Sequence, residues 1–248
     1  MTPGAYALLL GSAALAGLVN AVAGGGTLLT FPALLAAGIT PVAANVTSTL
    51  ALYPGQIASS IAYREHLDDM RHRLAFFAVP ALLGGFVGSS LLLVLPERAF
   101  AAVVPWLILF ACALLALQNP IRAALARWPH ADHPAALWIA QLLISVYGGY
   151  FGAGIGILML AAMGLMLREG LQHANALKNL NALLTNSAAV ALFVAFGPVH
   201  WHVALIMAVA SMAGGWVGAH FAQRLPPLVM RGFAITVGLV AAARFFLR

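Results

Sequence analysis

Charged residues are scarce in this sequence: they make up 7% of its 248 residues, whereas hydrophobic residues make up 63%. Ordinary soluble domains carry about 25% charged residues, so water could not solvate a soluble fold of this composition. The mean hydropathy of +0.98 agrees with that conclusion. The composition therefore excludes a soluble domain and predicts a polytopic, all-α integral membrane protein.

Acidic residues are especially few, and none of them lies within a long apolar run. The six are Glu65, Asp68, Asp69, Glu97, Asp132 and Glu169. A charge near the centre of a spanning helix costs roughly 2.5 to 3.5 kcal/mol, so this distribution is typical of membrane spans joined by polar connections. It disfavours proton coupling through a buried carboxylate, and it counts against a channel for metal cations.

Only one cysteine, Cys112, is present, and it lies inside an apolar run. One chain therefore cannot form a disulfide or a cysteine metal site, and no metal or cofactor is expected. The sequence also lacks the nucleotide-binding pattern G-x-x-x-x-G-K-[ST], which argues against nucleotide hydrolysis. The twelve Lys and Arg are scattered over short connections, so they indicate membrane topology rather than nucleic-acid binding.

Eight apolar runs have roughly the length of a membrane span, since a helix needs about 20 residues to cross a hydrocarbon core of about 30 Å. They cover 5–23, 41–63, 74–95, 99–117, 135–151, 171–196, 203–222 and 228–247. Two shorter pieces, 27–38 and 157–167, follow glycine clusters, and each predicts a half-helix or re-entrant segment. The polar connection 118–134 predicts the boundary between a first half, 1–117, and a second half, 135–248.

The two halves correspond at a fixed offset of 130 residues, without a gap. The matches are Gly24 and Gly26 with Gly154 and Gly156, Ala44-Asn45 with Ala174-Asn175, Gly84 to Gly88 with Gly214 to Gly218, and Leu95-Pro96 with Leu225-Pro226. Two unrelated apolar helices would rarely match in glycine, asparagine and proline at one register. The pattern predicts two homologous repeats of four spans, each with a glycine-broken first helix. An even number of crossings per repeat predicts that the repeats are parallel.

Glycine clusters precede both short apolar pieces: Gly24-Gly25-Gly26 in the first half, and Gly152, Gly154 and Gly156 in the second. Paired interruptions of this kind indicate the central site of a transporter, because broken helices direct free N–H groups and a positive dipole end at an anion. The alternative is close helix packing through small residues. We assign that packing role to Gly84, Gly88, Gly214 and Gly218.

Polar residues follow one face of the second helix in each half, at 100° per residue. The first stripe is Asn45, Ser48, Thr49, Gln56, Ser59 and Ser60, and the second is Asn175, Lys178, Asn179, Thr185 and Asn186. Lipid would not tolerate such faces, so both stripes are expected to turn inward and toward each other. They form either interhelical hydrogen bonds, worth about 0.6 kcal/mol each, or a shared polar cavity.

Lys178 is the only charged residue in these stripes. It lies within two turns of the expected start of its helix, so one interpretation is that its ammonium group reaches the membrane interface. The other is that Lys178 is the counter-ion of an anionic substrate. The sequence leaves both open.

Four motifs resemble a known family. They are N-A-V-A-G-G-G-T-L-L-T-F-P at 20–32, A-N-V-T-S-T at 44–49, G-G-Y-F-G-A-G-I-G at 148–156 and N-A-L-K-N at 175–179. They are similar to the sulfite exporter TauE/SafE family of bacterial membrane permeases, and the resemblance covers nearly the whole chain. It implies a duplicated bundle of seven to eight spans in the cytoplasmic membrane that moves small sulfur-containing organic or inorganic anions.

We therefore predict a secondary transporter of small sulfur-containing anions such as sulfite or organosulfonates, with one central site and no catalytic residue. The predicted substrate-binding residues are Asn20, Gly24, Gly25, Gly26, Thr27, Asn45, Ser48, Thr49, Gln56, Gly154, Gly156, Asn175, Lys178, Asn179 and Asn186. The alternatives are an anion or cation channel, or an intramembrane enzyme that uses Ser89 or Ser90 with His220. Ser90 and His220 occupy equivalent positions at the offset, so they form no evident nucleophile and base pair.

The expected partners are a small anion and the lipid bilayer, with a homodimer as an option and no nucleic acid. The expected location is the bacterial inner membrane, with both termini in the cytoplasm. Eight spans would place one group of cations on the cytoplasmic side, in agreement with the positive-inside rule. That group is Arg64, Arg71, Arg73, Arg122, Arg127, Arg244 and Arg248.

Overall fold

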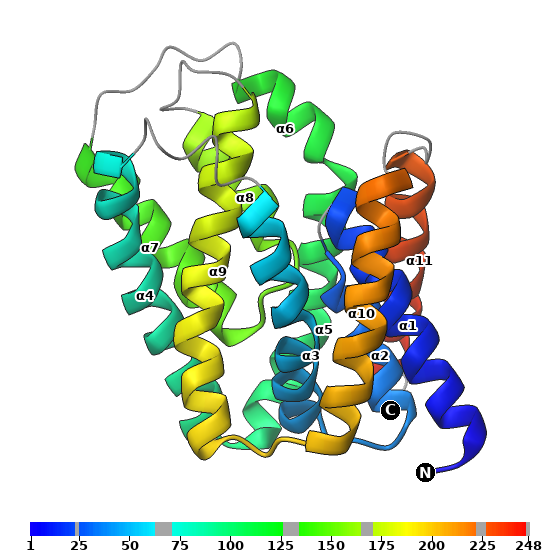
Figure 1. Cartoon of the computed structure of the whole chain (residues 1–248). Coiled ribbons are helices and arrows are strands. Elements are labelled where there is room, and N and C mark those ends of the chain that lie inside the picture. The colour runs from blue at the N-terminus through cyan, green and yellow to red at the C-terminus, as the bar shows by residue number, and fades with distance from the viewer. Residues whose placement is uncertain (23–24, 63–70, 126–133, 165–170, 222–226, 247–248) are drawn as a thin grey trace.

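The structure is a computed structural model that describes residues 1–22, 25–62, 71–125, 134–164, 171–221 and 227–246, and every regular element in those ranges is a helix (Figure 1). The first half contains α1 (Pro3–Val22), α2 (Thr27–Ala36), α3 (Pro41–Ala62), α4 (Arg71–Val94) and α5 (Glu97–Ala116). The short α6 (Gln118–Leu125) follows. The second half contains α7 (Pro134–Tyr150), α8 (Ile155–Gly164), α9 (Leu171–Phe196), α10 (Trp201–Phe221) and α11 (Pro227–Phe246).

The longer helices coincide with the predicted apolar runs, and the ten-residue helices α2 and α8 coincide with the two predicted half-helices. Among the described residues, four helices are long and apolar enough to cross a membrane by length and composition alone, namely α1, α4, α5 and α9. The sequence did not predict α6, because its polar residues suggested an irregular connection. The connection between the halves therefore begins as a helix.

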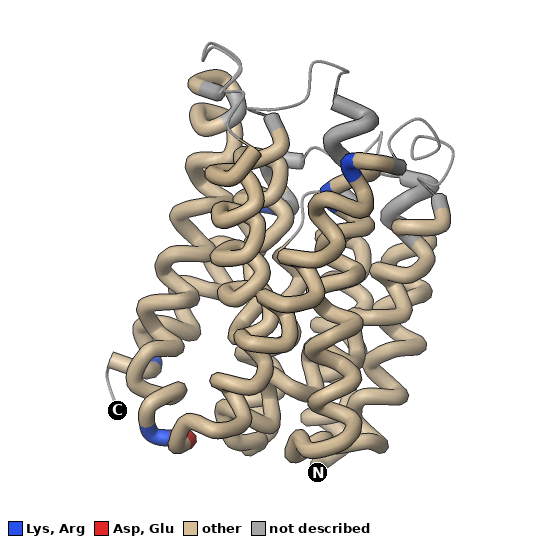
Figure 2. Tube along the Cα trace, turned by 90° about the vertical axis from the view of Figure 1, so that its left-hand side faces the viewer, with Lys and Arg blue, Asp and Glu red and all other residues tan. Residues whose placement is uncertain are grey.

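Exposed and buried residues are distributed as in a protein surrounded by lipid. Large apolar side chains cover the outside, for example Val94 (81% exposed) and Phe196 (77%), whereas Ser48, Gln141 and Thr185 are completely buried. The charged residues that the structure describes lie toward the two ends of the bundle, and the length between them carries none (Figure 2). Polar groups inside and apolar groups outside are expected when the solvent is a bilayer.

The helices of one half pack mainly against the other half. α1 packs along α10, while α4 packs along α7 and α9. Glycines permit these approaches, because a methyl group on Gly214 would overlap the carbonyl of Ala14, and one on Gly88 would overlap the carbonyl of Val146. The prediction of close packing is confirmed for Gly84, Gly88 and Gly214, and the surroundings of Gly218 lie outside the described part.

Helices that the 130-residue offset makes equivalent run in opposite directions. Ser60 of α3 contacts Asn179 of α9, while Tyr53 contacts Ser187, so the two helices are antiparallel. α5 and α11 are also antiparallel, because the end of α11 lies beside the middle of α5 and the middle of α11 lies near the end of α5. A two-fold axis relating such helices crosses the bundle, so the expected parallel relation is wrong. The half-helices α2 and α8 each add a return pass, and they make the number of passes per half odd.

Both termini lie at the same end of the bundle (Figures 1 and 2). The end of α3, the start of α4, and α6 lie at the opposite end (Figure 1). The prediction that placed the C-terminus on the side of residues 64–73 and 118–134 is therefore wrong. It counted eight passes, whereas the return segment α2 reverses the side of the connections between α3 and α7, and α8 restores the predicted side for the connections that follow.

Candidate functional site

The first helix break lies between α1 and α2. Gly25 has φ +95°, a conformation that glycine adopts without steric cost. The Asn20 side-chain oxygen accepts a hydrogen bond of 2.7 Å from the backbone N–H of Gly26, so the last turn of α1 holds the start of the half-helix. A methyl group on Gly26 would press into the carbonyl of Ala16 and the Asn20 amide. The motif therefore fixes a sharp, closely packed reversal.

The second break, between α7 and α8, is built in a related way. Gly152 and Gly154 have φ +78° and +76°, and the Tyr147 hydroxyl donates a 2.6 Å hydrogen bond to the carbonyl of Ala153. Two left-handed residues separated by one residue turn the chain back toward the side from which α7 came (Figure 1). Both breaks predicted from glycine clusters are thus present.

The two breaks meet beside the same part of α5. A methyl group on Gly25 would contact Leu115, and one on Gly154 would contact Leu114 and Ala111. Aromatic rings close the space between them. Phe31 of α2 lies edge-on to Phe151, with 5.5 Å between ring centroids, and both adjoin Phe100. Glycine clusters far apart in the sequence therefore lie close together in the fold.

The polar stripes of α3 and α9 face each other, as expected. Asn186 donates a 2.9 Å hydrogen bond to the side-chain oxygen of Gln56, its own equivalent at the 130-residue offset. The Tyr53 and Ser187 hydroxyls are 2.8 Å apart, and Ser60 donates to the backbone carbonyl of Asn179. In this conformation the two stripes thus bond directly to each other across the middle of the bundle.

Asn45 connects the first stripe to the second break. Its amide nitrogen donates a 2.9 Å hydrogen bond to the carbonyl of Tyr150, at the end of α7. Its side chain is 1% exposed, and its amide oxygen has no hydrogen-bond partner among the described residues. The Ser48 hydroxyl bonds to Thr30 of α2, and Thr49 donates to the carbonyl of Asn45 within its own helix. Asn45 is therefore a buried amide with unused acceptor capacity beside both half-helices.

Lys178 lies next to the second break. A methyl group on Gly156 would be 3.4 Å from Cδ of Lys178, so the alkyl stem of the lysine lies against the first turn of α8. The side chain is half-buried. The N-terminal turn of a helix carries a partial positive charge of roughly half an elementary charge. The stem of a cationic side chain and the N-terminal turn of a half-helix therefore lie together.

The other predicted residues have these positions. Thr27 is the first residue of α2 and is half-buried, and Asn179 contributes its carbonyl to Ser60. Gly24 lies outside the described residues. Asn175 belongs to α9, but its side chain lies outside the described part. The structure thus brings most of the set to the breaks and to the α3 and α9 contact, and its role in substrate binding stays a prediction.

Sequence reasoning missed a buried polar cluster between α7 and α9. Gln141 donates to the Ser145 hydroxyl at 3.0 Å, and Thr185 donates to the same oxygen at 3.1 Å. Asn181 of α9, which is 1% exposed and donates to the carbonyl of Leu177, was also missed. The spacing of four residues between Gln141 and Ser145 was the available signal, because it places both on one face of an otherwise apolar helix. Ser89, a candidate nucleophile, donates its hydroxyl to the carbonyl of Gly85 in its own helix.

Comparison with known proteins finds relatives described as membrane transporters. A probable membrane transporter protein of Haemophilus influenzae is 27% identical over 230 residues, which cover 92% of this chain and 89% of that protein. Probable membrane transporter proteins ORF9 of a Sinorhizobium species and YfcA of Escherichia coli are each 27% identical over 240 residues, covering 96% and 94% of this chain and 91% and 86% of theirs. No solved structure matches the chain. The model of one family, described as sulfite exporter TauE/SafE, matches residues 9–245, so the chain belongs to the TauE/SafE family.

Proposed function

We propose that this membrane transporter moves small sulfur-containing anions, such as sulfite or organosulfonates, as a secondary transporter. The observation that carries the proposal is the contact between the Lys178 stem and Gly156 at the start of α8. A cation at the N-terminus of a half-helix selects negative charge. The family description, sulfite exporter, supports sulfur oxyanions as the substrate class.

The residues around the breaks supply the remaining chemistry of an anion site. An anion that enters a low-dielectric bundle loses its hydration and needs hydrogen-bond donors in exchange. The amides of Gln56 and Asn186, now bonded to each other, would turn toward the ligand when α3 and α9 separate. Charge-assisted hydrogen bonds from Lys178 and from the α8 N-terminus would contribute most of the binding energy.

An inverted repeat relation accounts for access from both sides. We infer two repeats, 1–117 and 135–248, related by a two-fold axis that crosses the bundle, with eight spans and two half-helices between them. Rocking one set of helices against the other about such a site exposes it to each side in turn. The hydrogen bonds from Ser60 and Tyr53 to α9 would break and reform in that cycle.

Export would be driven by the membrane potential. An anion that leaves a negative-inside cell gains about 2.3 kcal/mol per charge for each 100 mV. None of the six acidic residues lies in a long apolar run, so the sequence offers no spanning carboxylate for proton coupling.

Flux measurements in proteoliposomes test this function. We expect protein-dependent and saturable flux of sulfite or a short alkanesulfonate, which accelerates when the imposed potential drives the anion and slows when the potential is reversed. Sulfate and Mg²⁺ serve as comparison solutes. Flux of Mg²⁺ without flux of any sulfur anion would instead indicate a cation channel, and flux that does not saturate would indicate an anion channel.

We further propose that the end of the bundle opposite the termini faces the cytoplasm. Among the described residues, Arg98 at the start of α5 and Arg244 in the last turn of α11 lie at the terminal end, and Arg71, Arg73, Arg122 and Arg231 belong to helix ends at the opposite end. The sequence adds Arg248 after α11, and it adds Arg64, Arg127, Arg168 and Arg224 to the connections between helices that end at the opposite end. The positive-inside rule then places both termini outside the cytoplasm, contrary to the expectation from eight passes alone.

Reporter fusions measure this orientation. Alkaline phosphatase fused after the C-terminus is expected to be active and green fluorescent protein at the same position dark, because only the phosphatase folds outside the cytoplasm. A fusion that ends after Leu125 in α6 is the matched control and should give the reverse pattern. A fluorescent C-terminal fusion together with a dark fusion at Leu125 would reverse the proposed orientation.

A further inference from the structure

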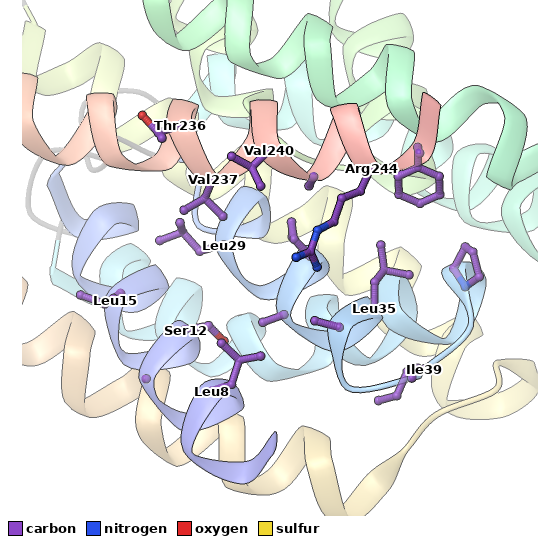
Figure 3. A pocket seen from close by; sticks show the side chains of 18 of the residues that line it. Leu8, Ser12, Leu15, Leu29, Leu35, Ile39, Thr236, Val237, Val240 and Arg244 are labelled. Carbon is purple, nitrogen blue, oxygen red and sulfur yellow. The ribbon is translucent and has the colours of Figure 1, made fainter. Parts of the chain in front are cut away.

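A large cavity lies between α1, α2 and α11, away from the proposed anion site. Its volume is about 870 Å³, within the range of about 300–1,000 Å³ that ligand pockets occupy. The walls are mostly aliphatic, with Leu8 and Leu15 on α1, Leu29 on α2 and Val240 on α11 (Figure 3). Such walls suit a hydrocarbon chain rather than a small hydrated ion.

The cavity opens sideways to the surface that lipid covers. Leu8 is 46% exposed and Val240 is 55% exposed, whereas Leu29 at the back is buried. In a bilayer this opening faces acyl chains rather than water. The space between α1 and α11 is therefore accessible to a lipid from the surrounding membrane.

Arg244 supplies the one charge in the cavity lining. It lies in the last turn of α11, near the end of the bundle where both termini are found. Its side chain extends from α11 into the cavity (Figure 3). No hydrogen bond or ion pair links this side chain to the part of the chain that the structure describes, and no acidic residue is among those lining the cavity. Guanidinium groups bind phosphate in a bidentate manner.

We propose that this cavity binds an anionic phospholipid, whose phosphate pairs with Arg244 and whose acyl chain lies against Leu15 and Leu29. The polarity of the site matches that of a lipid: the cation lies toward the end of the bundle, and the aliphatic walls extend inward from it. Basic pockets between membrane helices bind acidic head groups on the cytoplasmic side of membranes, and in the orientation proposed above this pocket would bind one in the opposite leaflet. The inference is independent of which solute the protein transports.

A lipid in this position would pack on the back of the half-helix α2. The other side of α2 bonds to α3, through Thr30 and Ser48. Gly25 and Gly38, at the two ends of α2, have φ +95° and +86°, so the half-helix lies between two backbone positions that favour glycine. Occupation of the cavity would therefore limit displacement of α2 away from α3.

Thermal unfolding of the purified protein in detergent tests the charge requirement. Phosphatidylglycerol is expected to raise the melting temperature by about 4 °C or more at saturation, and phosphatidylcholine by clearly less. Arg244→Gln should remove the difference between the two lipids, whereas Arg244→Lys should keep part of it. The control Arg231→Gln alters a cation on the same helix that bonds to Asn119, and it should preserve the difference.

A second pair of variants tests the position of the lipid. Gly11 lines the cavity and Gly4 does not, and a methyl group on either meets nothing within 4 Å. Gly11→Leu should fold normally and lose the stabilisation by phosphatidylglycerol, while Gly4→Leu should retain it. Equal stabilisation by both lipids, or full retention in Arg244→Gln and Gly11→Leu, would overturn the proposal. Stabilisation by inorganic phosphate alone, equal to that by the lipid, would show that the site binds a free anion.

Discussion

Replacing Lys178 with alanine is expected to lower anion transport at least tenfold while leaving membrane insertion normal. A hydrogen bond to a charged group contributes roughly 1.5–3 kcal/mol, which corresponds to about a tenfold to hundredfold change in affinity. Lys178→Arg should restore only part of the activity, because a planar guanidinium cannot replace a compact ammonium beside Gly156. The measurement is the initial rate of sulfite or sulfonate flux in proteoliposomes at equal protein density.

The matched control for the lysine variant is Arg231→Gln. Arg231 donates a 2.9 Å hydrogen bond to Asn119 of α6, outside the two stripes, so its loss removes one positive charge without touching the breaks. We expect near-normal transport from it. A second experiment treats the unaltered protein with an amine reagent that stays in the aqueous phase. If Lys178→Ala transports at the unaltered rate and the reagent modifies Lys178 in the unaltered protein, the lysine reaches the membrane interface. The anion site would then consist of the glycines and amides alone.

Replacing Gly88 or Gly214 with alanine is expected to destabilise the protein strongly. The added methyl group would overlap the carbonyl of Val146 or of Ala14, so α4 would be forced from α7, or α10 from α1. Overpacking of this kind costs about 1–3 kcal/mol or more, and the melting temperature falls by about 2–4 °C per kcal/mol in proteins of this size. Thermal unfolding in detergent measures the loss.

Gly4 and Gly232 provide the controls for these glycine variants. Both belong to long helices, α1 and α11, and a methyl group on either meets no atom within 4 Å. Alanine there is expected to be neutral or to stabilise by about 0.4–1 kcal/mol, because it restricts the unfolded chain. A fall in melting temperature as large in Gly4→Ala as in Gly214→Ala would mean that contact between helices is not the cause.

The sequence predicts the position of the helices well, because length and hydropathy determine where a chain can cross a bilayer. The predicted run 171–196 coincides with α9, and the glycine clusters correctly indicated that α1 and α7 are followed by half-helices. The mutual orientation of the stripes was also predictable, since polar faces cannot point into lipid. Gln56 and Asn186 demonstrate this, because two residues at equivalent positions bond to each other.

The direction of the second half could not be predicted from the sequence. Hydropathy records that 27–38 is apolar and short, but it does not record that α2 returns toward the end from which α1 started. One uncounted return pass in each half reverses the relation between the halves and moves the α3–α4 connection and α6 to the end opposite the termini. The polar cluster of Gln141, Ser145 and Thr185 was missed for another reason. Its members belong to different helices, and its offset equivalents Gly11, Leu15 and Gly55 are not polar as a group.

The pairing of α1 with α10 and of α4 with α7 has a consequence for biosynthesis. When the first five helices have left the ribosome, the faces of α1 and α4 that contain Gly17, Gly84 and Gly88 have no partner, because those partners are encoded later. α1 therefore lacks its main packing partner until α10, near the end of the chain, has been inserted into the membrane. An ancestral chain of half this length could have completed the same contacts only by intertwining with a second copy inserted in the opposite orientation.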